Sequence, residues 1–414
     1  MKQEINHFYI HVPFCIRKCG YCSFFSLEFS DSRKETYIDY LKIEINEYIQ
    51  RYDFNPKTIY FGGGTPSLLS STEINKILSC FEINEYREVT IETNPITITE
   101  EYVASLKRTK INRISLGAQS FIEKELKLLG RLHNSAQIVK AVEVLRKHTF
   151  NNISLDLMYG LPNQKLADVK YSLEKIIELQ PEHISTYCLS LEEDVPLFKN
   201  KSMIPGDKTV SEFYYLILDE LLKAGYQQYE ISNFSIEGRE SKHNLSYWND
   251  KSYLGFGPSA AGYVNTDCHP EPFDTTLDKL HRRILRYTSQ ADFDGYCNLI
   301  QTSKVEKHRN VRRSSKCLEK DYSHDSQHSE DSTKSKHSEV ITKDDHEKEY
   351  IFLALRKTEG LNLNRFNETF SVDFIQKYSL ILLKYKKYIE LKDGFAKLTP
   401  TAYFVSNEIL SEFM

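Results

Sequence analysis

The sequence predicts an α/β protein, namely a partial or full parallel (β/α) barrel followed by a small α+β domain of the winged-helix type. Three observations support this fold class. Strand-like and helix-like patterns alternate six times between residues 7 and 189. Polar or glycine-rich residues stand at or just beyond five of the strand ends. Helix-like patterns and then a hairpin-like pattern occupy residues 346–414.

Six strands are expected, and a helix follows each of them. They cover residues 7–14, 57–61, 88–92, 113–117, 153–157 and 183–189. The first helix has apolar residues at three- and four-residue steps, and Asp31 or Ser32 is its expected N-cap. Repeated βα units form parallel sheets with right-handed crossovers. The functional site of such a barrel is therefore expected at the carboxyl ends of the strands.

The loop after the first strand carries Cys15, Cys19 and Cys22 at C-x3-C-x2-C spacing. Thiolates are the natural ligands of iron–sulfur clusters, and three of them can hold three corners of a 4Fe–4S cluster while one iron stays open. A zinc knuckle and incidental buried thiols are the alternatives. Structural zinc normally takes four ligands, and no second Cys or His pair follows at the short spacings of such sites. The five other cysteines are scattered, which favours a reducing compartment.

Residues at the other strand ends are candidate ligand contacts. The stretch Gly62–Ser67 lacks the lysine of a phosphate-binding loop, so it is either a tight turn or a close backbone approach to a ligand. Glu92 and Asp156 are carboxylates at the ends of apolar strands, where an unpaired charge is costly. A helix cap or a salt bridge is the alternative for Glu92. Gln119 and Arg131 serve structure as often as ligands.

The motifs taken in order resemble those of the radical S-adenosylmethionine proteins, in particular the oxygen-independent coproporphyrinogen III oxidase-like branch. The resemblance covers residues 7 to about 300 and includes Y-I-H-V-P-F-C, G-G-G-T-P-S, E-T-N-P, N-R-I-S-L-G-A-Q-S-F, L-G-R-L-H and D-L-M-Y-G-L-P. It implies a 4Fe–4S cluster on the three cysteines, whose open iron takes S-adenosylmethionine for cleavage to an adenosyl radical. It also implies contacts to S-adenosylmethionine from Tyr9, Tyr21, Gly63, Gly64, Thr65, Glu92, Gln119, Arg131 and Asp156.

Two members of this branch must be separated, a dehydrogenase that makes protoporphyrinogen and a heme chaperone. The dehydrogenase has a cysteine two residues after the cluster motif, where this chain has Phe24, and a longer arm before Cys15. The stretch His243–Trp248 resembles the H-N-x-x-Y-W signature of the heme chaperones. The resemblance implies heme ligation by an exposed His243, with Tyr247 and Trp248 against the porphyrin. A buried core histidine is the alternative, and the dehydrogenase is the alternative function.

Four domains or segments are expected: a barrel with the cluster over residues 1–240, a heme-site and barrel-closing segment over 241–300, a disordered insertion over 301–345, and a winged-helix-like domain over 346–414. Within the second segment, the turn-rich residues 255–262 are expected to close over the barrel mouth. The insertion is rich in serine and charge. Its histidines leave a metal-binding tail as an alternative.

Charge and hydropathy limit the partners. The chain has 54 Lys plus Arg and 58 Asp plus Glu, so it has no general attraction for nucleic acid. It has no run of 18 apolar residues and no signal-peptide pattern at its start, so we expect a cytoplasmic protein without a membrane span. The implied partners are heme, S-adenosylmethionine, heme-accepting proteins and an electron donor.

Overall fold

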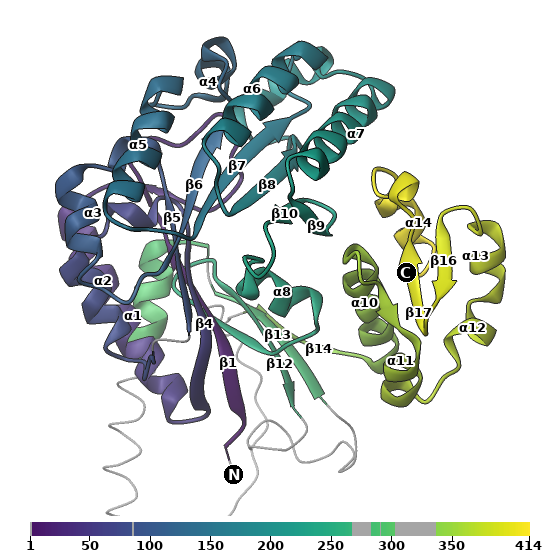
Figure 1. The fold of residues 1–414 in the computed structure, drawn as a ribbon. Coiled ribbons are helices and arrows are strands. Elements are labelled where there is room, and N and C mark those ends of the chain that lie inside the picture. Colours follow the sequence, from purple (N-terminus) through teal and green to yellow (C-terminus); the bar gives the residue numbers. More distant parts are fainter. Residues whose placement is uncertain (1, 85–86, 267–282, 290, 303–336) are drawn as a thin grey trace, which may run out of the picture.

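The computed structural model describes residues 2–84, 87–266, 283–289, 291–302 and 337–414. Its centre is a 12-stranded sheet with the order β14-β13-β12-β11-β1-β4-β5-β6-β7-β8-β10-β9 (Figure 1). Six parallel strands form the middle of this sheet: β1 (Glu4–Val12), β4 (Asp53–Gly63), β5 (Glu88–Thr93), β6 (Arg113–Gln119), β7 (Ile153–Tyr159) and β8 (His183–Cys188). All six lie where the sequence predicted them, which confirms the parallel α/β fold.

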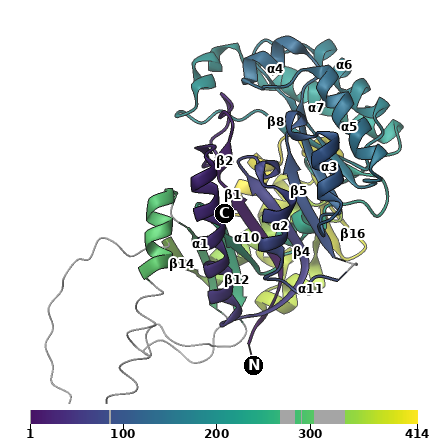
Figure 2. The same cartoon turned by 90° about the vertical axis from the view of Figure 1, so that its left-hand side faces the viewer.

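The helices that follow these strands cover one face of the sheet, as Figures 1 and 2 show. They are α1 (Asp31–Ile49), α2 (Ser71–Leu78), α3 (Glu100–Leu106), α4 (Glu123–Leu129), α5 (Ser135–Lys147), α6 (Leu166–Glu178) and α7 (Asp207–Lys223). The N-cap of α1 is Ser30, one residue before the predicted position. No helix in the described residues combines the length and apolarity needed to cross a membrane.

Strand alternation divides the side chains between the two faces. In β1, Phe8, Ile10 and Val12 are fully buried beneath the helices, whereas Tyr9 and His11 point to the opposite face, which we call the inner face. Both ends of the described sheet are antiparallel: β9 (Gln227–Glu230) and β10 (Asn233–Ser235) at one, and β12 (Ala261–Thr266), β13 (Arg283–Thr288) and β14 (His337–Ile341) at the other. The end strands β14 and β9 do not pair with each other, so the described strands form an open sheet, that is, a partial barrel.

Residues 255–262 do not close over the barrel mouth as the sequence predicted. Residues Tyr253–Phe256 form β11, which pairs parallel to β1, and the chain then turns back into β12. Phe256 is fully buried and its ring stacks at 6.3 Å from that of Phe8. A helix over residues 293–302 packs beside α1, where the Tyr296 hydroxyl donates to Glu44 Oε2 at 2.8 Å. This segment therefore extends the central sheet.

The C-terminal part begins earlier than residue 346. Strand β14 pairs with β13, and α10 (Lys343–Arg356) follows, so folded structure is present within the last nine residues of the predicted disordered insertion. Residues 303–336 of that insertion lie outside the described residues.

A small α+β unit follows α10. It contains β15 (Leu361–Asn362), α11 (Leu363–Phe370), α12 (Phe374–Lys377), α13 (Ser379–Lys384), β16 (Ile389–Lys392), β17 (Phe395–Leu398) and α14 (Ser406–Ser411). The hairpin of β16 and β17 turns at Asp393-Gly394, both with positive φ, as the sequence predicted. These helices with a three-stranded sheet make up the expected winged-helix-like arrangement.

Candidate functional site

The cysteine loop leaves the carboxyl end of β1 and is anchored by backbone hydrogen bonds. Strand β2 (Phe14–Cys15) pairs with β3 (Leu27–Glu28), which fixes the two ends of the loop. In its middle, the Gly20 amide donates to the Leu129 carbonyl at 3.1 Å, and the Gly20 carbonyl accepts from the Leu197 amide at 2.8 Å. The loop is thus held against the segments that follow β6 and β8.

The three thiols of this loop are half-buried, free and close enough to influence one another. Burial raises the pKa of the Cys22 thiol, and negative charge at Cys19 and Cys15 raises it further. Two donors approach the sulfurs: Thr65 Oγ1 lies 3.6 Å from Cys15 Sγ, and Arg131 Nη1 lies 3.6 Å from Cys19 Sγ. Hydrogen bonds to thiolate sulfur stabilise its negative charge and tune cluster potentials. This donor set fits a 4Fe–4S cluster. Among the described residues, no three His, Cys, Asp or Glu side chains are grouped as ligands of a single metal ion.

The glycine stretch after β4 lies directly against the cysteine loop. The Thr65 amide donates to the Phe14 carbonyl at 2.7 Å. A Cβ on Gly64 would lie 2.6 Å from that same carbonyl oxygen, and Gly63 has a φ of 106°. Gly64 therefore requires glycine because a side chain would push the two loops apart, and Gly63 requires it because its φ is positive and a Cβ would meet the His11 ring at 2.7 Å. The close backbone approach expected from the sequence is present, although it is made to the cysteine loop.

Two carboxylates lie on the inner face near the cysteine loop. Glu92 Oε1 accepts from the Tyr60 hydroxyl at 2.8 Å, and Glu92 Oε2 accepts from the Gly63 amide at 3.2 Å. Burial raises the pKa of Glu92 from 4.5 to about 7. Asp156 accepts from Ser115 Oγ at 3.4 Å, and burial raises its pKa from 3.8 to about 7 against the opposing charge of Arg113. The negative charge of either carboxylate also disfavours ionisation of the other.

These raised pKa values have a consequence for folding. Between about pH 4 and pH 7 the folded chain holds protons on Glu92 and Asp156 that the unfolded chain has released. The contribution of the two groups to the free energy of unfolding therefore falls as the pH rises through this range. A cationic ligand at the site would favour the ionised carboxylates and offset this loss.

Three further residues lie close to the carboxylates of Glu92 and Asp156, namely Tyr9, Tyr21 and Arg131. The Tyr9 hydroxyl lies 3.1 Å from His11 Nδ1, and the ring stacks 6.2 Å from that of Tyr60. Burial raises the pKa of Tyr21, whose hydroxyl interacts with the charges of Arg131 and Asp156. Arg131 Nη2 donates to the Gly117 carbonyl at 2.8 Å, which holds this guanidinium between β6 and Cys19.

Gln119 ends β6 in a left-handed conformation with a φ of 68°. The sheet register between β6 and β7 shifts just before it. A Cβ on Gly117 would lie 2.9 Å from Gln119 Nε2 and 3.1 Å from Arg131 Nη2. The Gln119 amide and the Arg131 guanidinium thus flank Gly117, and the three cysteines with all nine expected S-adenosylmethionine contacts gather at one edge of the sheet.

His243 does not belong to this group, and the expectation of an exposed imidazole is wrong. It lies on α8 (Lys242–Trp248), which packs on the inner face against β4, and it is fully buried. Its Nδ1 is 2.7 Å from Thr58 Oγ1, and its Nε2 is 2.8 Å from the Tyr247 hydroxyl. The amide of His243 also donates to Glu88 Oε1 at 3.0 Å. Both ring nitrogens are therefore engaged in this conformation, as in a core histidine.

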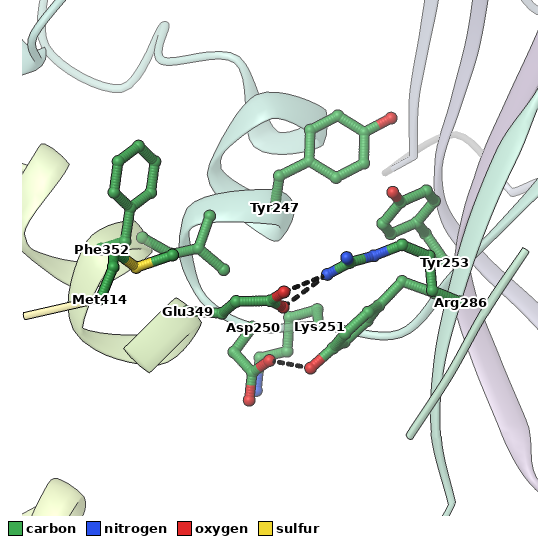
Figure 3. Close-up of a pocket in the computed structure, with 10 residues that line it drawn as sticks. Tyr247, Asp250, Lys251, Tyr253, Arg286, Glu349, Phe352 and Met414 are labelled. Atoms are coloured by element: carbon green, nitrogen blue, oxygen red, sulfur yellow. Dashed lines mark hydrogen bonds and ion pairs between the residues drawn. The ribbon is translucent and has the colours of Figure 1, made fainter. Parts of the chain in front are cut away.

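The same Tyr247 lines a cavity of about 330 Å³ between the sheet extension and α10. Tyr253 and Phe352 supply apolar walls, and Figure 3 shows Arg286 directed at Glu349 across the cavity. The Arg286 guanidinium pairs with Glu349 at 2.5 Å and with Glu339 at 2.9 Å, so its charge is compensated. This cavity contains none of the cluster or strand-end residues.

Two inner-face residues that contribute to the site were not singled out in the sequence. Tyr60 is bonded to Glu92, and Ser115 is bonded to Asp156. The available signal was alternation, because Tyr60 has the strand parity of Gly62, and Ser115 has that of Gly117. On a strand that is apolar on one face only, the residues of the other face are therefore candidate ligand contacts.

Comparisons with known proteins agree with this geometry. The model of the Radical SAM superfamily matches residues 9–176, and that of the HemN C-terminal domain matches residues 341–405. A solved structure entitled coproporphyrinogen III oxidase (HemN) from Escherichia coli superposes with a TM-score of 0.75 over 99% of this chain and 90% of that one, at 18% identity, which shows a shared fold.

Curated relatives carry one name across several bacteria. The heme chaperone HemW of Lactococcus lactis is 38% identical over 274 residues, 64% of this chain and 71% of that protein. The heme chaperone HemW of Bacillus subtilis is 30% identical over 418 aligned residues, 98% of each chain. The latter match spans both the partial barrel and the C-terminal unit. The chain therefore belongs to the HemW heme chaperone family of radical S-adenosylmethionine proteins.

Proposed function

We propose that this chain binds heme and transfers it to acceptor hemoproteins, while retaining a 4Fe–4S cluster and a site for S-adenosylmethionine. The observation that carries this proposal is the alignment with the heme chaperone of Bacillus subtilis over 98% of both chains. The gathering of three thiols and two carboxylates at one sheet edge supports the retained cofactor site. The likeness to coproporphyrinogen III oxidase concerns the fold and does not by itself favour the dehydrogenase.

The residues at the sheet edge would divide the binding of the cofactors. Cys15, Cys19 and Cys22 would ligate the cluster, which supplies an electron and an open iron when bound. Glu92 has the charge to receive the ammonium group of S-adenosylmethionine. Asp156 has lone pairs for ribose hydroxyls. The other parts of S-adenosylmethionine would be oriented by contacts from Gly63, Gly64, Tyr9, Tyr21, Thr65, Gln119 and Arg131.

The raised pKa values predict that binding of S-adenosylmethionine depends on pH. An ammonium group is bound best by an ionised carboxylate, and Glu92 ionises only near pH 7. We expect the affinity to rise from about pH 5.5 to pH 7, by roughly tenfold for one carboxylate that must lose its proton, and to level off towards pH 8 as the α-amino group of the ligand loses its own proton. The measurement is calorimetric titration of the reconstituted protein with S-adenosylmethionine at several pH values.

Glu92→Gln tests the origin of this dependence. The variant should bind less tightly and should lose most of the pH dependence, because the amide neither charges nor releases a proton. Tyr60, Tyr9 and Asp156 face the same carboxylate and stay in place, so any residual slope belongs to Asp156. Glu101→Gln, on the exposed start of α3, is the matched control and should keep the wild-type profile. A Glu92→Gln profile as steep as that of the wild type would contradict this explanation.

Binding of heme by His243 requires a local rearrangement. Iron binds the lone pair of a neutral imidazole, and burial lowers the pKa of His243, which keeps the ring neutral. The Nε2 atom nevertheless bonds to the Tyr247 hydroxyl. We therefore propose that heme replaces this hydrogen bond, with Tyr247 moving away from the imidazole.

The proposed function is tested by heme titration and transfer. The anaerobically purified, cluster-loaded chain is titrated with heme, then mixed with an apo-hemoprotein whose holo spectrum is distinct. The expected result is a Soret shift on binding, followed by the spectrum of the acceptor. Incubation with coproporphyrinogen III and S-adenosylmethionine should give no decarboxylated product, whereas its formation would favour the dehydrogenase. Absence of a Soret shift would overturn the chaperone assignment.

The cellular setting and the remaining partners follow from the same proposal. The six cysteines in the described part of the chain are free thiols, which fits a reducing compartment. We therefore place the protein in the cytoplasm, where an electron donor for the cluster and heme-accepting proteins would be its partners. Their identities require capture from the native organism with heme-loaded protein.

A further inference from the structure

Arg113 is a buried cation without a partner in the described structure. It opens β6 and is only 2% exposed, the largest side chain among the fully buried residues. Its guanidinium Nε has no hydrogen-bond partner, and the described residues offer the rest of the group no hydrogen bond or ion pair. A buried charge is normally paired, because an uncompensated one costs several kcal/mol. Arg113 therefore forms no ion pair in the described structure, and the carboxylate on which its charge acts, Asp156, lies beyond ion-pair distance.

The side chain faces the inner side of the partial barrel. Arg113 has the strand parity of Ser115 and Gly117, which contact Asp156 and Arg131 respectively. Its charge acts on Asp156 and on Tyr60, which lie in β7 and β4. It also acts on His183 and His243. The guanidinium is thus surrounded by inner-face groups of several elements.

Those neighbours are already engaged with one another. The Tyr60 hydroxyl donates to Glu92. His183 has Ser154 Oγ at 2.8 Å from Nδ1 and the Tyr229 hydroxyl at 2.8 Å from Nε2. The two nitrogens of His243 are bonded to Thr58 and Tyr247. Asp156 accepts from Ser115 and makes no hydrogen bond to Arg113. A guanidinium has five N–H donors and no acceptor, so in this conformation the oxygen atoms that would satisfy it come from a ligand or from water.

We propose that Arg113 binds a propionate carboxylate of the porphyrin on the inner face. This inference rests on the proposed binding of heme. A carboxylate matches the planar fork of a guanidinium through two parallel hydrogen bonds. Heme carries two propionates on a flat ring, and the rings of Tyr60 and His243, which stack on each other at 5.0 Å, lie on the same inner face.

S-adenosylmethionine also carries a carboxylate, but most of its expected contacts lie nearer the cluster edge. In the sheet register Glu92 pairs with Ser115, two residues after Arg113, and Gln119 lies six residues after it. At about 3.3 Å per residue, these contacts lie roughly 7 and 20 Å along the strand from Arg113. Tyr9 lies at the level of Arg113, through the pairs Tyr9–Tyr60, Tyr60–Thr90 and Thr90–Arg113. Arg113 therefore lies deeper along the inner face than Glu92 and the cluster edge. The ligand arm that reaches it must extend away from the cysteine loop.

The experiment compares heme with heme dimethyl ester, in which both propionates are blocked. Both are titrated into the full, cluster-loaded chain and into Arg113→Met, Arg113→Lys and Arg33→Met, the last an exposed arginine of α1. We expect wild type and Arg33→Met to prefer heme by about tenfold to a hundredfold, as for a charge-assisted hydrogen bond. Arg113→Met should bind both ligands alike, and Arg113→Lys should keep part of the preference.

Several outcomes would overturn this assignment. Equal affinity of the wild type for heme and its ester excludes a bound propionate without reliance on any variant. An Arg113→Met chain that keeps the full preference for heme places the propionate elsewhere. Weaker binding of S-adenosylmethionine by Arg113→Met, with its heme preference intact, assigns the guanidinium to that ligand. Failure of the wild type to bind heme overturns the proposed function as well, whereas the other results leave it standing.

Discussion

Replacing Cys19 with serine is expected to remove the iron–sulfur cluster altogether. Only three thiols serve the cluster, and the Cys19 sulfur is also the one that Arg131 approaches at 3.6 Å. A serine hydroxyl is a poor iron ligand, so two thiolates would remain for a site that needs three. After anaerobic reconstitution, iron and sulfide should fall from about four of each per chain to near zero. The broad visible absorption of the cluster should disappear with them.

The matched control for this prediction is Cys80→Ser. Cys80 is half-buried and packs against the hydrophobic core, so its thiol has no role at the cluster. This variant should reconstitute as the wild type does. Full iron and sulfide in Cys19→Ser would contradict the ligand assignment. Loss of iron in both variants would show that reconstitution depends on general stability.

Replacing His243 with alanine is expected to destabilise the fold and also to abolish heme ligation. The buried imidazole joins Thr58 to Tyr247, so its removal leaves a cavity and an unpaired Tyr247 hydroxyl, whereas the Thr58 hydroxyl keeps its bond to His7 Nδ1 at 2.9 Å. We expect a loss of about 2 to 4 kcal/mol in the free energy of unfolding. Urea unfolding followed by circular dichroism measures this loss. Loss of heme binding in this variant alone would therefore not identify the ligand.

Tyr247→Phe separates the two effects of His243. The phenyl ring preserves most of the packing and frees Nε2 of His243 for iron. If His243 is the ligand, heme affinity should increase about threefold to tenfold, the size of one neutral hydrogen bond. Tyr253→Phe is the control, because its ring packs 4.6 Å from that of Tyr247 without bonding His243. Unchanged or weaker heme binding by Tyr247→Phe would remove His243 from the iron.

The local parts of the fold and site could be predicted from the sequence. Strand alternation and helical periodicity are properties of short segments, and they gave the six parallel strands. Residues at the carboxyl ends of parallel strands must meet at one edge, so the sequence alone groups Glu92 and Asp156 with the cysteine loop. The Asp393-Gly394 turn was equally local, since its φ values favour that pair.

Features that depend on distant pairing could not be predicted. The turn-rich pattern of residues 255–262 favours a segment that closes over the barrel mouth, yet β11 pairs with β1, more than 240 residues earlier in the chain. The burial of His243 likewise depends on the position of α8 in the fold, because its partners Thr58 and Glu88 come from β4 and β5. Arg113 gave no signal, because an arginine at the start of a strand normally lies at a solvated edge. Its burial arises from elements that cover the inner face.

The polar character of the inner face would affect how a bound porphyrin is released. A lining of leucine and valine would retain a porphyrin through contact area alone, and release would require exposing all of that area to water at once. Tyrosine, serine, histidine and arginine side chains hold a guest by a few directional bonds, which an acceptor can exchange one after another. Off-rates then set the residence time, as is usual among related complexes. A polar inner face therefore favours transfer of a bound porphyrin to an acceptor over its long retention.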